Sequence, residues 1–194
     1  MSKRVFIIHG WGGYPEEGCF PWLRLNLENR GFAVQIPAMP DTDWPQIDPW
    51  VSHLAKVVDR PDTATYLIGH SIGAQTILRY LQSLREGENI GGAIFLAGWV
   101  NLTDAALDEE PNNREIAKPW LEQSINWEKV KSHCNQFTGI FSDDDPHVLL
   151  SDSKIFEAKL GAKTIIEHGK GHFSGSDGIT ELPSLLNAVL EISN

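Results

Sequence analysis

The chain has 194 residues, of which 41% are hydrophobic, so it can bury one sizeable core and we expect a single domain over residues 1–194. Its 26 acidic and 16 basic residues give a formal net charge of -10. This is the wrong sign for a surface that neutralises phosphates, which argues against nucleic acid as a partner. Two cysteines, Cys19 and Cys134, lie far apart and predict neither a disulfide framework nor a thiolate zinc site, as in a reducing compartment.

The N-terminal stretch MSKRVFIIHGWGG contains only a short apolar run before a polar turn. That run is too short for the core of a signal peptide and far too short for a membrane span. We therefore expect a cytoplasmic protein that does not associate with membranes.

Six short apolar runs rich in β-branched residues predict strands, and helical patterns separate them. Several runs are almost continuously apolar, which is typical of strands covered on both faces. The alternation predicts an α/β fold, a three-layer sandwich with a mostly parallel six-stranded sheet and helices on both faces. With right-handed crossovers, the expected strand order is 2-1-3-4-5-6. The runs lie at residues 4–8, 32–36, 65–69, 92–98, 137–141 and 163–167.

Helical patterns fill the stretches between these runs. The first ends before Gly31, a residue typical of helix C-termini. In the second, Asp48 and Pro49 predict a cap followed by proline at the first helical position. The predicted helices cover residues 20–30, 47–58, 73–84, 153–160 and 180–191.

Residues 99–127 interrupt the alternation of strands and helices. The segment is long, acidic at residues 108–110 and broken by Pro111 and Pro119. A connection of this length is usually functional or mobile. We expect it to form a partial cap over the functional site, with an excursion over the solvated surface as the alternative.

The pentapeptide GHSIG, residues 69–73, lies between the third predicted strand and a predicted helix. It fits the pattern G-x-S-x-G, in which serine occupies a sharp turn between strand and helix and the glycines prevent steric clashes. An ordinary strand-to-helix turn is the alternative interpretation. Because the strand and the helix that the pattern requires are both predicted, Ser71 is a candidate nucleophile.

A serine hydroxyl needs a base to take its proton, and the base needs a group that orients it. In this pattern an acid and then a histidine follow the serine, each in a loop after a later strand. The fifth predicted strand is followed by Asp143, Asp144 and Asp145, and the sixth by His168 and His172.

Within these two clusters, Asp145 and His172 are favoured. The following proline biases Asp145 toward an extended conformation that can direct its carboxylate across the sheet edge, whereas the other two aspartates are typical of turns or caps. His172 follows a glycine in the loop, while His168 lies at the strand end and stays as the alternative base. We expect no metal site, since hard cations need more oxygen ligands at set spacings and no EF-hand pattern is present.

The negative oxygen of a tetrahedral intermediate needs backbone N–H donors, which form an oxyanion hole. In this architecture they come from the residue after the nucleophile, here Ile72, and from a loop after an earlier strand. The sequence HGWGG after the first strand suits that loop, and Trp11 is the natural donor. The expected strand order places the first and third strands side by side, so HGWGG and GHSIG should meet at one crevice.

These motifs resemble those of the α/β-hydrolases, and more narrowly those of the small serine hydrolases of the retinoblastoma-binding protein 9 type. The resemblance covers nearly the whole chain and rests on VFIIHGWGG, PAMPD, LIGHSIGA, SDDDPHV and GKGHF, with Trp50 in the helix after PAMPD. It implies a compact α/β-hydrolase fold in which Ser71 is the nucleophile, Asp145 the acid and His172 the base. No motif for a protein partner is found.

We therefore predict a carboxylesterase-like serine hydrolase that cleaves an ester, thioester or small amide bond through an acyl-enzyme intermediate, without a metal or another cofactor. Its partner is a small-molecule acyl substrate, and Trp11, His70 and Trp99 near the strand ends are expected to contact it. An acyltransferase with the same triad is not distinguished from a hydrolase. The rival interpretation is a binding protein that keeps the fold with an inactive triad.

Overall fold

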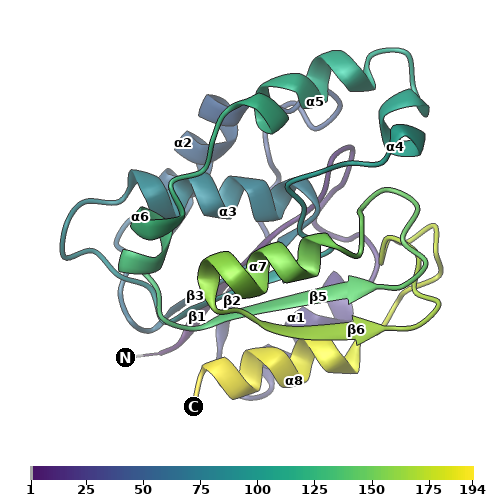
Figure 1. Cartoon of the computed structure of the whole chain (residues 1–194). Helices are drawn as coiled ribbons and strands as arrows, with labels where there is room; N and C mark the ends of the chain where they lie inside the picture. Colours follow the sequence, from purple (N-terminus) through teal and green to yellow (C-terminus); the bar gives the residue numbers. More distant parts are fainter. Residues whose placement is uncertain (1) are drawn as a thin grey trace.

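The computed structural model describes residues 2–194. A six-stranded sheet lies at the centre of the molecule (Figure 1). All neighbouring strands in the sheet are parallel. Their order is β2-β1-β3-β4-β5-β6, which confirms the predicted order. The strands are β1 (Arg4–Ile8), β2 (Ala33–Gln35), β3 (Thr65–His70), β4 (Gly92–Leu96), β5 (Phe137–Ser142) and β6 (Lys163–Glu167).

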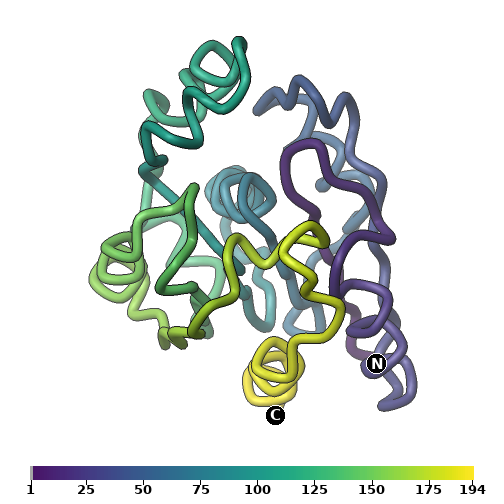
Figure 2. Tube along the Cα trace, turned by 90° about the vertical axis from the view of Figure 1, so that its right-hand side faces the viewer, coloured from purple at the N-terminus to yellow at the C-terminus, as the bar shows by residue number. Residues whose placement is uncertain are grey.

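Helices cover both faces of this sheet and give the predicted three layers (Figures 1 and 2). One face carries α1 (Phe20–Glu28) and α8 (Pro183–Ile192), which contact each other. The helices of the other face are α2 (Ile47–Val58), α3 (Ile72–Ser83), α6 (Trp127–Ser132) and α7 (Asp152–Leu160). The longest of them, α2 and α3, have 12 residues each. Between residues 2 and 194, no helix combines the length and the apolar character needed to cross a membrane.

The centre of the sheet is buried on both faces. Every residue of β3, β4 and β5 is buried, whereas the edge strands β2 and β6 include exposed positions. A nearly continuous apolar sequence suits a strand with helices on both sides, because neither face meets water. Burial of these side chains drives folding and holds the carboxyl ends of the strands at defined positions.

Most predicted boundaries agree with the structure to within a few residues, and the differences have local causes. β4 ends at Leu96 instead of residue 98, because Ala97 has a positive φ of 45° that turns the chain out of the sheet. The prediction that Pro49 is the first residue of α2 is wrong, since the helix begins at Ile47 and Asp48 lies in its first turn. Pro49 is tolerated in the first turn of α2 because N–H groups of a helix's first turn have no acceptor within the helix.

The segment 99–127 forms α4 (Asp104–Asp108) and α5 (Asn113–Glu122) and leads into α6. Its start is anchored by the buried carboxylate of Asp152 at the beginning of α7. That carboxylate accepts hydrogen bonds from the backbone N–H groups of Val100 and Asn101 at 2.7 and 2.8 Å, and from the Asn101 side chain at 2.8 Å. Three donors on one carboxylate stabilise a charge that would otherwise be costly to bury.

The other end of this segment is anchored by Arg79 of α3. Its buried guanidinium donates to the carbonyl oxygens of Trp120 and Gln123 at 2.8 and 3.0 Å and lies 5.3 Å from the ring centroid of Trp120. The indole N–H of Trp120 in turn donates to the carbonyl of Pro45 at 3.0 Å. A cation beside the last carbonyls of a helix is favourable, so Arg79 fixes the C-terminal end of α5 to α3.

The close approach of α3 to β1 generates a stability prediction. A Cβ at Gly73 would collide with the carbonyl oxygen of Ile8, a backbone atom that cannot move aside. Gly73→Ala should therefore lower the free energy of unfolding by about 3 kcal/mol. The matched control is Gly161→Ala, where φ is 67° but a Cβ meets open space, and its cost should be about 1 kcal/mol. Equal losses in urea unfolding of the two variants would contradict this packing argument.

Candidate active site

Ser71 lies in the predicted turn between β3 and α3, in a backbone conformation that residues other than glycine rarely adopt. Its φ and ψ are 54° and -118°, and such strain costs about 1–3 kcal/mol. The flanking glycines allow the turn, because a Cβ on Gly69 would lie 2.5 Å from the backbone nitrogen of Ala74 and a Cβ on Gly73 would meet β1. The spacing G-x-S-x-G thus has a steric cause in this chain.

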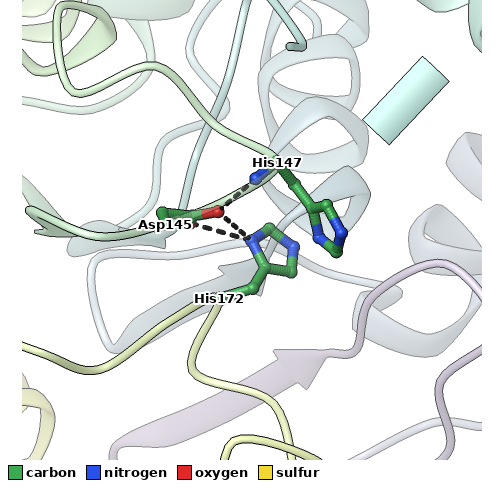
Figure 3. Close-up of side chains that lie close together, drawn as sticks. All are labelled: Asp145, His147 and His172. Carbon is green, nitrogen blue, oxygen red and sulfur yellow. Dashed lines mark hydrogen bonds and ion pairs between the residues drawn. The ribbon is translucent and has the colours of Figure 1, made fainter. Parts of the chain in front are cut away.

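Asp145 and His172 come together from two separate loops. Asp145 follows β5 and His172 follows β6, and Nδ1 of His172 lies 2.8 Å from Oδ2 and 3.0 Å from Oδ1 of Asp145 (Figure 3). The histidine side chain is 12% exposed and the aspartate side chain 2%, so water has little access to the pair. This geometry favours the tautomer with its hydrogen on Nδ1, which leaves Nε2 as a proton acceptor.

The carboxyl group of Asp145 is held in its ionised form. Burial alone would raise its pKa, but the hydrogen bond and the charge of His172 oppose that effect, as do the backbone N–H groups of His147 and Val148, which donate to Oδ1 at 2.8 and 3.0 Å. The net result is a pKa below the ordinary value of an aspartate. Asp145 is therefore an anion at neutral pH.

The other candidates of the two clusters have different partners. The alternative base, His168, has a side chain that is 83% exposed, and its Nδ1 lies 2.6 Å from Oδ2 of Asp143. Asp144 accepts a hydrogen bond from the hydroxyl of Ser142 at 2.6 Å. Of the three successive aspartates, the structure brings Asp145 to His172.

Ser71 and His172 line one cavity, which has a volume of about 330 Å³. The hydroxyl of Ser71 makes no hydrogen bond to any other residue between 2 and 194. Contacts of this kind often tighten only when a substrate binds. The cavity is also bordered by the three residues predicted to contact substrate and by part of the segment 99–127, namely Trp11, His70, Trp99, Leu102, Ala106 and Glu109.

The loops after β1 and β3 meet beside Ser71. β1 is paired with β3 along the whole length of β1, with Ile8 opposite Gly69. A Cβ added to Gly10 would lie 3.6 Å from the Cβ of Ser71, so the first loop passes directly over the nucleophile turn. The predicted meeting of HGWGG and GHSIG at one crevice is confirmed.

Two backbone N–H groups at this junction are available to a ligand. The N–H groups of Gly12 and Gly13 donate to carbonyls within residues 2–194, whereas that of Trp11 donates to none there. Ile72 is the first residue of α3, where an N–H has no acceptor within the helix. Trp11 and Ile72 are the two residues predicted for the oxyanion hole.

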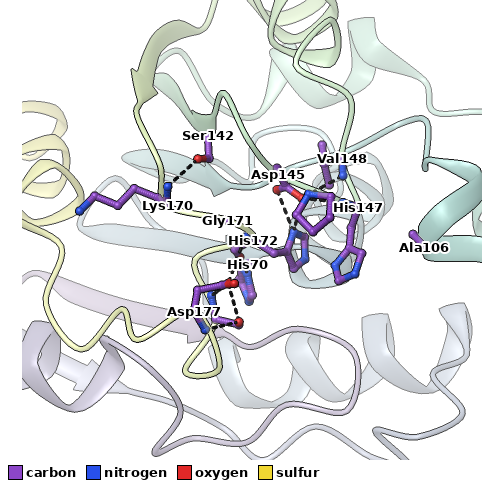
Figure 4. A network of polar contacts seen from close by, with 12 residues as sticks. His70, Ala106, Ser142, Asp145, His147, Val148, Lys170, Gly171, His172 and Asp177 are labelled. Atoms are coloured by element: carbon purple, nitrogen blue, oxygen red, sulfur yellow. Dashed lines mark hydrogen bonds and ion pairs between the residues drawn. The ribbon is translucent and has the colours of Figure 1, made fainter. Parts of the chain in front are cut away.

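His70 lies under His172 at the edge of the cavity. It is 3% exposed, and its Nε2–H donates to the carbonyl oxygen of His172 at 2.7 Å (Figure 4). Burial lowers the pKa of His70 to about 3, and the nearby His172 adds to this shift. His70 is therefore uncharged at neutral pH, and its ring nitrogen is committed to the loop that carries His172.

Among the cavity residues that the sequence analysis missed, His147 and Glu17 carry ionisable side chains. The ring of His147 packs edge-on against that of His172, with centroids 4.8 Å apart, and its Nε2 lies 3.1 Å from Glu109 of α4's C-terminal end. Its place two residues after Asp145 was the available signal. Glu17 has a buried carboxylate oxygen without a hydrogen-bond partner among residues 2–194, and burial raises its pKa. No sequence pattern pointed to Glu17.

Asp145, His147 and His172 form a cluster of possible metal ligands. Each offers one ligand atom, and these atoms lie within 4.8 Å of one another (Figure 3). The contact between His172 and Asp145 is already accounted for without an ion, because Nδ1 of His172 lies at hydrogen-bond distance from both carboxylate oxygens. The arrangement therefore fits a hydrogen-bonded acid and base better than a resident metal.

A parallel sheet in this order, with a strained serine turn after β3, defines the α/β-hydrolase fold. Residues 5–191 match the family model described as serine hydrolase, and the chain belongs to this family of enzymes. It is 31% identical over 186 residues to YdeN of Bacillus subtilis (strain 168), which is named as a hydrolase, covering 94% of this chain and 92% of that protein. It is also 25% identical over 178 residues to serine hydrolase RBBP9 of Rattus norvegicus, covering 91% and 89% of the two proteins.

Solved structures agree with this assignment. The crystal structure of the ydeN gene product from B. subtilis has a TM-score of 0.89 at 27% identity and covers 98% of both chains. Est1E from Butyrivibrio proteoclasticus has a TM-score of 0.72 at 17% identity, covers 98% of this chain and 88% of its own, and shares the fold. The predicted family resemblance and the predicted fold class are both confirmed.

The burial of His70 makes stability depend on pH. Its pKa is about 3 in the folded protein against 6.5 ordinarily, so the unfolded chain binds the proton more readily and the free energy of unfolding falls as pH drops from 6.5 toward 3. Between roughly pH 7 and 5, titration of this group should lower the free energy of unfolding by about 2 kcal/mol. His70→Gln keeps an N–H donor but cannot titrate. In urea unfolding, its free energy of unfolding should therefore fall between pH 7 and 5 by about 2 kcal/mol less than that of the wild type. Equal losses would contradict the buried, neutral His70.

Proposed function

We propose that this serine hydrolase cleaves carboxylic esters, thioesters or small amides through an acyl-enzyme intermediate on Ser71, with His172 as general base and Asp145 as its orienting acid. The observation that carries the proposal is the Asp145–His172 pair at 2.8 Å, which opens on the same cavity as the strained Ser71. The carboxylesterase-like chemistry and the hydrolytic outcome, as opposed to acyl transfer, are part of this proposal.

In the first half-reaction, Oγ of Ser71 attacks the carbonyl carbon while Nε2 of His172 takes the hydroxyl proton. The tetrahedral intermediate then collapses, the bond to the leaving group breaks, and His172 delivers its proton to the leaving group. In the second half-reaction, water attacks the acyl-enzyme, His172 takes a proton from it, and Ser71 recovers that proton as the carboxylic acid leaves. The anionic Asp145 stabilises the imidazolium in both halves.

The oxyanion of each tetrahedral intermediate is held by the backbone N–H groups of Trp11 and Ile72. Two observations support this role: the N–H of Trp11 has no acceptor within the described residues 2–194, and Ile72 is the first residue of α3. Donors fixed by the backbone need no rearrangement as charge develops, and one such donor contributes about 3 kcal/mol to the transition state. The positive end of the α3 dipole adds to the same effect.

The acyl substrate is a small molecule that binds between Trp11, His70 and Trp99, and the segment 99–127 is its partial cap. The cavity volume of about 330 Å³ suits a small or medium acyl group, and the contribution of α4 to the cavity wall supports the cap. The lining includes Glu17, Glu109 and Glu110 and no lysine or arginine of the described chain. These carboxylates disfavour anionic acyl groups.

We further propose that the enzyme acts in the cytoplasm without a metal or another cofactor, and without nucleic acid or membrane partners. The net charge of -10 argues against binding to polyanions. Both cysteines are free and buried, which suits a reducing compartment. The chemistry described above needs only protein groups and water.

The nucleophile assignment is tested by intact-mass spectrometry after incubation with a fluorophosphonate probe. The wild type should gain a single adduct, and Ser71→Ala and His172→Ala should not, while hydrolysis of p-nitrophenyl esters falls on the order of 10⁴-fold or more in both variants. Ser176→Ala removes another cavity hydroxyl and is the matched control, which should label as the wild type does. A well-folded wild type without an adduct would instead favour the binding-protein interpretation.

The cap assignment is tested by Ala106→Phe, which places a large side chain in the cavity wall. The kcat/KM for an octanoyl ester should fall about tenfold or more, whereas that for an acetyl ester should change about twofold at most. Ala105→Phe alters the same helix at an exposed position that does not line the cavity. The kcat/KM values for the octanoyl and acetyl esters should therefore both stay at the wild-type level. An identical acyl-chain profile in Ala106→Phe and the wild type would contradict the cap.

A further inference from the structure

Two of the three successive aspartates after β5 have no part in the proposed reaction. Asp143 and Asp144 are exposed, and the sequence alone suggests only turns or caps for them. In the structure both carboxylates point to the loop 168–172, which connects β6 to His172. Asp145 binds the final residue of that same loop through the His172 side chain.

The contacts between the two loops run in register. Asp143 accepts a hydrogen bond from the backbone N–H of Gly169 at 3.1 Å, and Asp144 accepts one from that of Gly171 at 2.9 Å. Between them, the hydroxyl oxygen of Ser142 accepts from the N–H of Lys170 at 3.0 Å (Figure 4). The same Ser142 hydroxyl donates to Asp144 at 2.6 Å. The N–H groups of the three successive residues 169–171 thus each have an acceptor at the end of β5 or in the loop that follows it.

The opposite side of the loop is held as well. Oδ2 of Asp177 accepts from the N–H of His172 at 3.0 Å, and His70 donates to the carbonyl of His172. Gly171 has a φ of 54°, and a Cβ there would collide with the carboxylate of Asp177. The main chain at residues 171 and 172 is therefore confined between two carboxylates and the buried ring of His70.

This confinement matters because residues 168–172 lie outside the helices and strands. No ladder of backbone hydrogen bonds fixes their path, so side-chain acceptors must do so. Hydrogen bonds to a charged acceptor are shorter and about twice as strong as neutral ones. The hydrogen bonds from Ser142 and Gly171 lower the pKa of Asp144, so its carboxylate carries this charge at neutral pH.

We propose that Asp144, together with Ser142, is a positioning residue that docks the loop 168–172 so that the imidazole of His172 meets Asp145 and faces Ser71. Asp143 is a second, more peripheral anchor of the same loop. The proposal rests on the proposed role of His172 as the base. Displacement of a base by about 1 Å can cost a hundredfold in rate, which sets the scale of the expected effect.

The test compares second-order rates of fluorophosphonate labelling and the kcat for an acetyl ester. Asp144→Ala should lower both the labelling rate and the kcat about tenfold to hundredfold, with little change in KM. The reason is that a shifted loop misplaces His172 for the reaction but leaves substrate binding intact. Asp144→Asn keeps an oxygen that accepts from Gly171 and Ser142, so it should stay within about threefold of the wild type. Glu86→Ala removes an equal charge from an exposed position after α3 and should have no effect.

A double-mutant comparison separates positioning from general damage. If Asp144 acts through His172, Asp144→Ala should cause no further loss of the residual p-nitrophenyl ester hydrolysis that remains in a His172→Ala background. An additive loss there, or a wild-type rate in Asp144→Ala alone, would overturn the proposal. Should Asp144→Ala fail to fold, Ser142→Ala takes its place, since it deletes the acceptor of Lys170 and the donor to Asp144, and a wild-type rate would count equally against the proposal.

Failure of the underlying function gives a different result. If His172→Ala labels as fast as the wild type, His172 is not the base and the proposed function fails before Asp144 is considered. If His172→Ala is slow while Asp144→Ala matches the wild type, only the positioning role is lost.

Discussion

The close contact between the start of α3 and the end of β1 is the constraint on which the rest of the molecule depends. Gly69 and Gly73 have no Cβ, and a Cβ at either position would collide with backbone atoms. The absence of both Cβ atoms lets the chain turn sharply enough to hold Ser71 at a φ of 54°. The wholly buried strand on one side of this turn and the helix packed on the other compensate for the strain. The same contact brings the loop after β1 over the serine, and with it the N–H of Trp11, which has no acceptor among residues 2–194.

The features predictable from sequence are those that local chemistry determines. Continuous apolar runs indicated the central strands because both faces of those strands are covered, and G-x-S-x-G indicated the turn because only glycine fits beside the serine. The order of the strands followed from the handedness of crossovers. The proline after Asp145 favoured this residue over its two neighbours, but its pairing with His172 depends on the path of two distant loops. The contacts of Glu17 and His147 likewise depend on tertiary placement. The start of α2 at Ile47 does not follow the signal of Asp48 and Pro49.

The excess of acidic residues also has a structural explanation. At the carboxyl edge of the sheet, several carboxylates accept hydrogen bonds from backbone N–H groups of irregular segments, among them Asp143, Asp144, Asp145, Asp152 and Asp177. Loops that carry functional groups expose many such donors, and an unpaired buried donor is costly. Short acidic side chains satisfy these donors and order the loops. Part of the negative charge therefore serves the geometry of the site.

The separate anchoring of the two ends of the segment 99–127 has a consequence for divergence among relatives. Asp152 fixes residues 100 and 101, and Arg79 fixes the C-terminal end of α5, so the stretch between them is attached to the core at both ends. Substitutions, insertions or deletions in residues 104–113 change the wall of the cavity while the sheet, the serine turn and both anchors keep their positions. Such a stretch is free to accumulate sequence change, and a family built on this plan can acquire new substrates without renewing its catalytic core.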